Sequence, residues 1–141
     1  MTEDKLRDAL RSIHAKITPA EASAILDVAR LAAGADGKTD PDELAAIKML
    51  SKIIYELANV ATQDVPDPSR QIDPGRVLDI GATLERMGAR ELAFASAVAV
   101  AIHGDLTAGE SVFIGQLADA LVLDPQRARE LTSTIVPVVR T

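Results

Sequence analysis

Four ionisable residues occur at two similar places in the sequence, and their side chains are of kinds that bind divalent cations. Asp36 and Glu43 lie around one glycine-containing turn, and His103 and Glu110 lie around another. Carboxylate oxygens suit hard cations, and a neighbouring imidazole extends the choice to transition metals. The residue types therefore predict a metal site formed by Asp36, Glu43, His103 and Glu110.

The helices expected on either side of each turn determine where these residues would lie. The helix before each turn carries an apolar stripe that, extended by one step, reaches Asp36 in the first case and His103 in the second. Glu43 and Glu110 come one turn before the apolar stripe of the helix that follows. Asp36 could therefore lie close to Glu43, and His103 close to Glu110, across the turn between two helices.

The same four residues also have purely structural explanations. Glu43 and Glu110 stand where the glutamate of a helix capping box is expected. Asp36 could bond the amides of its turn, and His103 would favour a helix C-terminus through the helix dipole. Both interpretations, metal ligands and helix ends, stay open from the sequence. The sequence argues against an EF-hand, because aligning Gly37 and Glu43 to its loop leaves two acidic positions without an acid.

Helix starts are marked by capping residues and by proline at the first helical position. Capping boxes occur at 18–21, 40–43 and 107–110, and Asp73-Pro74 and Asp124-Pro125 carry a cap and a proline. Apolar residues recur at three- and four-residue steps between these starts, and no segment alternates with period two. The pattern predicts an all-α, compact bundle of about seven helices at 3–16, 19–35, 41–60, 74–87, 89–103, 108–122 and 125–136.

The two halves of the sequence correspond at an offset of 67 residues. Segment 31–54 aligns with 98–121, so that Gly37 matches Gly104, and cap and core positions match as well. We therefore expect one domain, 1–141, that contains two helix–turn–helix repeats related by a pseudo-two-fold axis. The repeats are predicted at about 18–60 and 85–122, with a connection at 61–72.

Composition excludes several classes of function. The net charge of −6 and the near absence of aromatic residues argue against nucleic-acid binding, which needs a basic face. The longest apolar stretch, 92–102, is too short to span a bilayer, and the charged N-terminus is unlike a signal peptide, so a cytoplasmic protein is expected. No cysteine, phosphate-binding glycine loop or nucleophile–base pattern supports an enzyme. His14, alone in the first helix, is expected at the surface.

An apolar helix followed by a turn such as Ala-Asp-Gly, and then by a capping glutamate that opens an amphipathic helix, occurs twice. This arrangement resembles the TerB-like family over about residues 22–135, most closely at 29–54 and 96–121. The resemblance implies a fold of about seven helices with two symmetric halves, and a non-enzymatic protein linked to tellurite or other chemical stress. It also implies that the motif acids Asp36, Glu43 and Glu110 bind a metal, whereas His103 departs from the usual acid and leaves room for a transition metal.

Two functions follow from these observations. The first is a stress-associated protein that binds a divalent metal through its inter-helix turns. The alternative is a metal-free protein–protein interaction or adaptor module. In either case we expect protein partners, including a membrane protein met at the membrane surface, with no nucleic acid and no membrane span in this chain.

Overall fold

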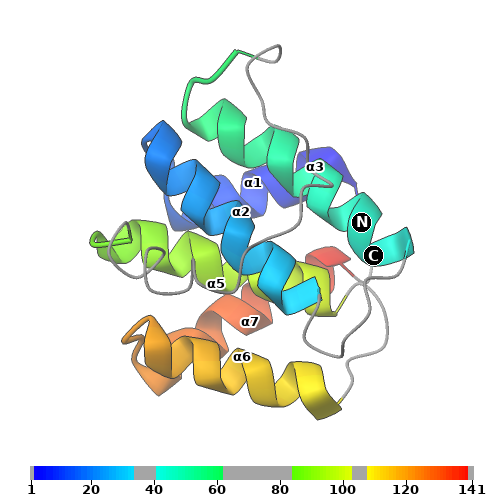
Figure 1. Ribbon diagram of the computed structural model, residues 1–141, viewed down its shortest axis with the longest axis vertical. Coiled ribbons are helices and arrows are strands. Elements are labelled where there is room, and N and C mark those ends of the chain that lie inside the picture. Colours follow the sequence, from blue (N-terminus) through cyan, green and yellow to red (C-terminus); the bar gives the residue numbers. More distant parts are fainter. Residues whose placement is uncertain (1, 34–40, 62–83, 103–107, 140–141) are drawn as a thin grey trace.

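The computed structural model describes residues 2–33, 41–61, 84–102 and 108–139, and in the last segment the side chains of 108–111 and 113 are excepted. These residues form helices and their connections, and they contain no strand. The all-α prediction is therefore confirmed for this part of the chain (Figure 1). The helices are α1 (Glu3–Ile13), α2 (Pro19–Ala33), α3 (Pro41–Leu57), α5 (Met87–Ala101), α6 (Ala108–Ala120) and α7 (Pro125–Val139).

Helix α5 is the centre of the fold. It contacts α1, α2, α3, α6 and α7, and every side chain from 92 to 102 is buried. A helix that is apolar on all sides is stable only when it is surrounded, and the alanine-rich sequence of α5 meets this condition. The apolar stretch is therefore the core helix of the domain. Within the described segments, no helix combines the length and the apolar character needed to cross a membrane.

Helix α2 makes the most extensive helix–helix contact of the described residues, along α5. The stripe that the sequence predicts on α2 is almost completely buried, with no member more than 1% exposed: Ala22, Ile25, Leu26, Ala29, Ala32 and Ala33. Alanine has little bulk, so alanines on both helices let the two backbones approach closely, and a larger side chain there would overpack the interface. The contact between α2 and α5 is thus rich in alanine, whereas leucine and isoleucine fill most of the remaining core.

Two of the predicted helix caps are formed. The hydroxyl of Thr18 accepts the backbone N–H of Glu21 at 3.1 Å, and the Glu21 carboxylate accepts the N–H of Thr18 at 2.9 Å, which completes a capping box. Asp124 caps α7 by accepting the N–H of Gln126 at 2.8 Å. The predicted starts of α2 and α7 are therefore confirmed. The caps predicted on Asp40, Asp73 and Thr107 lie outside the described residues.

The capping glutamate of α2 also joins the starts of two helices. Arg86, just before α5, donates from Nε to Oε2 of Glu21 at 2.9 Å and from Nη2 to the other carboxylate oxygen. It donates as well to the backbone oxygen of Lys16 at 3.3 Å. The hydrogen bonds from Arg86 hold the pKa of the buried Glu21 carboxyl below its usual value. Sequence analysis identified the cap but not this link across the fold.

The end of α1 corrects one expectation. The helix stops at Ile13, and His14 has an extended backbone whose N–H still bonds to Leu10. The imidazole of His14 lies against Gly88 in the first turn of α5, so closely that a Cβ added at Gly88 would be 2.6 Å from its Cγ and Cε1. His14 is half-buried and its Nε2 is enclosed. The prediction of a surface residue is therefore wrong, because His14 packs where α1 meets α5.

The end of α7 corrects a second expectation from the sequence. The sequence predicts that this helix stops at 136, because proline lacks the N–H for the helical bond and disfavours helix in the residue before it. The structure instead runs the helix through Pro137 to Val139. Ile135 and Val139 are both buried, on the same stripe as Leu131. Burial of this stripe outweighs the loss of one hydrogen bond near the helix end.

Helices α3 and α6 both end in a left-handed residue. Asn59 has a φ of 57°, and the N–H of Val60 reaches back to the carbonyl of Tyr55. Val122 has a φ of 56°, and the N–H of Leu123 reaches back to Ala118 in the same way. Both are Schellman ends, for which glycine and asparagine are the usual residues. Valine is β-branched, so Val122 stores backbone strain at this turn.

The predicted helix at 74–87 and the connection at 61–72 fall mostly outside the described residues. At the edge of that range, residues 84–86 are not helical, and Met87 is the first residue of α5. The predicted helix therefore cannot extend to 87. The first residues of α3 and α6, Pro41 and Ala108, are 67 positions apart, as the repeat requires. The superposition of the two halves stays a prediction.

Candidate functional site

The predicted metal ligands fall largely outside what the structure describes. Asp36, His103 and the side chain of Glu110 lie outside the described residues. Glu43 is described, and its side chain is buried in the first turn of α3, with the residue 4% exposed. Among the residues described here, no three histidine, cysteine or acidic side chains form a metal-binding group. The grouping of the four residues therefore stays a prediction.

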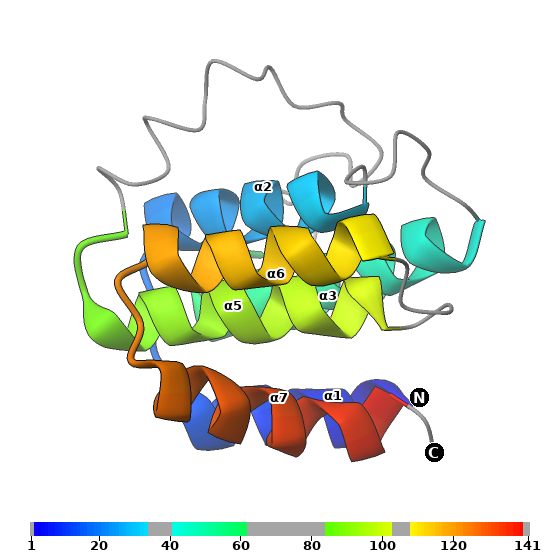
Figure 2. The same ribbon diagram turned by 90° about the horizontal axis from the view of Figure 1, so that it is seen from below.

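A different site arises from the way α6 and α7 leave their shared turn. Helix α6 packs on α5 and α2, whereas α7 packs on α5 and α1. The two consecutive helices make almost no contact with each other, although only residues 121–124 separate them. Figure 2 shows α7 beside α1 on one side of α5 and α6 nearer to α2 on the other. The two helices therefore diverge over α5, and a shallow groove lies between them.

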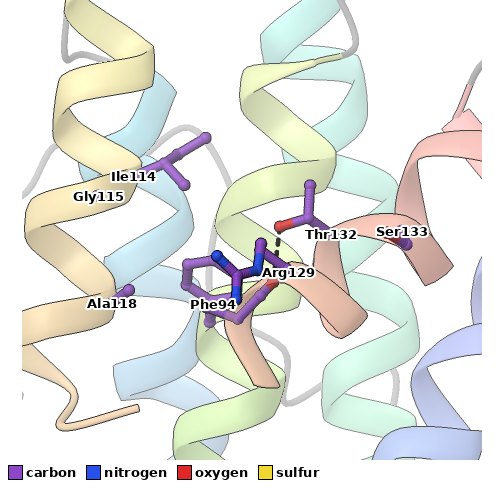
Figure 3. Close-up of a pocket in the computed structure, with 8 residues that line it drawn as sticks. Phe94, Ile114, Gly115, Ala118, Arg129, Thr132 and Ser133 are labelled. Atoms are coloured by element: carbon purple, nitrogen blue, oxygen red, sulfur yellow. Dashed lines mark hydrogen bonds between the residues drawn. The ribbon is translucent and has the colours of Figure 1, made fainter. Parts of the chain in front are cut away.

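The result is a groove of about 420 Å³ over α5 (Figure 3). The α5 residue in its floor is Phe94, which is only 1% exposed, and Ala128 of α7 lies beside it. The lining is mainly apolar and is open to solvent, so this is a shallow surface groove rather than an enclosed small-molecule pocket. Its lining residues are Phe94, Ile114, Gly115, Ala118, Ala128, Arg129, Thr132 and Ser133.

The α6 side of the groove is shallow at Gly115 and Ala118, because these residues have little or no side chain. A Cβ added at Gly115 would meet no atom within 4 Å, so the space next to this residue is open. Leu117 and Leu121 are buried. Ile114 is half-buried: it packs against the core and also lines the groove.

The wall on α7 carries the polar groups of the site. Thr132 donates its hydroxyl hydrogen to the backbone oxygen of Ala128 at 2.8 Å, the bond drawn in Figure 3. Ser133 is exposed beside it. Arg129 is exposed as well, and no carboxylate oxygen of the described residues lies within 4.0 Å of its guanidinium. The groove thus has an apolar floor and one cation on its edge.

Arg127, two residues before Arg129, forms ion pairs with carboxylates of the described residues. Arg127 donates to Glu91 at 2.9 Å and 3.0 Å and to Glu130 at 3.2 Å. These bonds tie α7 to α5 and raise the pKa of Arg127, chiefly through the hydrogen bonds with Glu91. Arg127 therefore holds the two helices together, whereas Arg129 forms no ion pair with a carboxylate of the described residues.

Sequence analysis did not identify this groove, although one signal was present. The sequence of α6, AGESVFIGQLADA, carries apolar or small residues on every side, while a surface helix normally has one apolar stripe and one polar face. Among the side chains described, Leu117 and Leu121 are buried, and Ile114 and Ala118 pack partly against the core. Val112 on the same helix is 60% exposed.

Comparison of the chain with protein-family models, with curated proteins and with solved structures finds no match. The TerB-like resemblance therefore rests on the sequence motif around the two turns.

Proposed function

We propose that this chain is a non-enzymatic interaction module of the TerB-like type that holds an apolar segment of a partner protein between α5, α6 and α7. The groove is the observation that carries the proposal, since it combines an apolar floor with walls that belong to helices not packed on each other. The sequence resemblance supports placing this module in the response to tellurite or other chemical stress, in the cytoplasm, with a partner that includes a membrane protein.

Exposed apolar side chains also occur on α6 and its following turn. Among the described residues, the large hydrophobic side chains that are exposed are Met87, Val112 and Val122. Val112 lies on α6 and Val122 on the turn that follows it, and neither lines the groove. Such side chains add apolar surface for contact with another protein.

Photo-crosslinking in the native host tests this proposal. A photoreactive residue placed at Ser133 or Ala118, on the two walls, should yield a discrete adduct with one protein. The same residue at Lys48, which is exposed on α3, should not. The adduct should vanish when Gly115→Leu fills the groove. Identical adducts from all positions, or none from the two walls, would contradict the proposal.

A divalent cation at the two inter-helix turns is the second candidate. The burial of Glu43 favours it, because a carboxylate in the first turn of α3 lies at the position that the sequence assigns to a ligand. A capping role for Glu43 explains the same burial, so the two must be separated by experiment. Melting temperatures should be measured with calcium, magnesium, manganese and zinc. A bound cation would stabilise the fold by about 2.7 kcal/mol at a hundredfold excess over its dissociation constant. Asp36→Asn with Glu43→Gln should fold and lose that gain, whereas indifference to all four ions would exclude this candidate.

A further inference from the structure

We infer that the partner segment is a short amphipathic helix whose acidic residue pairs with Arg129. This inference rests on the proposed function, because it names the occupant of the same groove. Three features carry it: the helical walls, the small residues of α6 and the charge on the edge of the groove.

The walls favour a helix over an extended peptide. Both walls are α-helices, whose backbone groups bond within the helix and leave no strand edge for an extended peptide to join. A third helix can instead insert its apolar face between them, which is a common mode of peptide recognition. Gly115 and Ala118 have little or no side chain, so the backbone of an incoming helix can approach α6 closely.

The length of the groove limits how much of that helix is held. The lining residues cover 114–118 on α6 and 128–133 on α7, which correspond to about 6 Å and about 7.5 Å at 1.5 Å per residue. Such a span covers little more than one helical turn. The occupant therefore offers two apolar side chains, three or four residues apart, to the apolar lining of the groove, in which Ile114 and Ala118 are partly exposed.

Charge defines the third requirement. Arg129 has no carboxylate of the described residues within 4.0 Å, so a carboxylate from outside can take that place. The chain as a whole has a net charge of −6, so it repels strongly acidic partners. The partner helix therefore carries one acid aligned with Arg129 and is otherwise neutral or basic. A bidentate arginine–carboxylate pair also fixes the register of the helix in the groove.

A displayed library of random 15-residue peptides, selected on the full chain, tests this inference. The expected peptides share two apolar residues at a spacing of three or four and one glutamate or aspartate on the same face. Arg129→Glu should weaken their binding at least tenfold, because a favourable charge pair becomes a repulsive one. Replacing the peptide acid with lysine should restore binding to the Arg129→Glu chain.

Two control variants accompany the selection. Lys48→Gln removes a positive charge from exposed α3, away from the groove, and should leave binding unchanged. Gly115→Leu fills the open space beside α6 and should abolish binding. Its melting temperature should stay close to that of the unchanged chain, because an added Cβ at Gly115 meets no atom within 4 Å.

The outcomes separate this inference from the proposed function. Peptides that need an open Gly115 position but show no acid and no response to Arg129→Glu would overturn the acidic helix and leave the interaction groove standing. Peptides that ignore Gly115→Leu, or no peptides at all, would overturn both. If dodecanoate binds in an Arg129-dependent way and peptides do not, the occupant is a small anionic amphiphile and the helix is excluded.

Discussion

The contact between Gly88 and His14 allows a sharp test of how α1 joins the core. Gly88→Ala adds one methyl group in the first turn of α5, and that carbon would lie 2.6 Å from Cγ and Cε1 of the imidazole. Carbon atoms in contact are separated by about 3.5–4.0 Å, so the ring must move by about 1 Å. Because the ring is half-buried with its Nε2 enclosed, it cannot move without loss of packing.

The magnitude follows from two opposing effects. Overpacking of this kind costs about 1–3 kcal/mol. Alanine in place of glycine within a helix raises the free energy of unfolding by up to about 1 kcal/mol. Gly88→Ala should therefore lower the free energy of unfolding by about 1–2 kcal/mol overall. In a His14→Ala background the clash is absent, so the same change should raise stability by about 0.5–1 kcal/mol.

Urea unfolding followed by circular dichroism measures all four chains of this cycle. Gly115→Ala is the matched control, because Gly115 is also helical but an added Cβ there meets no atom within 4 Å. It should stabilise the protein by about 0.5–1 kcal/mol. If Gly88→Ala is harmless, or equally harmful with and without the imidazole, the packing of His14 on α5 is not as described.

Three further changes have defined outcomes. Val122→Gly should stabilise by about 1 kcal/mol in thermal melts, because glycine relieves the left-handed strain and the valine is 69% exposed, whereas Val112→Gly, inside α6, should destabilise. Arg86→Gln should destabilise the protein at neutral pH, because it removes the charged hydrogen bonds to the buried Glu21 carboxylate. Arg86 lowers the pKa of Glu21 in the folded state. The stabilisation by Arg86 is therefore present above the pKa of unfolded glutamate, about 4.3, and is lost as pH falls through the folded pKa. Urea unfolding should show the free energies of unfolding of the two chains converging in acid. Ser96→Ala should stabilise by about 1 kcal/mol in the same assay, because the Ser96 hydroxyl is fully buried and makes no hydrogen bond among the described residues.

Residues close together in the sequence were sufficient to predict two helix caps and the buried stripe of α2. The capping box of Thr18 and Glu21 and the cap on Asp124 depend on residues within three positions, and they formed as predicted. The stripe of α2 followed from helical periodicity alone. The burial of α5 could also be read from its composition, since it has no polar face in its second half.

Contacts between distant residues could not be predicted in the same way. Arg86 and Glu21 are 65 positions apart, and nothing in either local segment indicates the other. His14 meets Gly88 only because α1 packs on α5. The groove depends on α6 and α7 packing on different neighbours of α5, which is a property of the whole arrangement.

The most direct test of the account is where a selected peptide binds. Amide and methyl NMR signals of the labelled chain should be recorded during titration with a peptide from the selection. The account predicts that the largest shifts fall on Ile114, Gly115, Ala118, Thr132 and Ser133, and that the signals of α3 around Lys48 stay unchanged. Shifts that cluster on α3 or at the end of α2, with the groove residues unaffected, would contradict it.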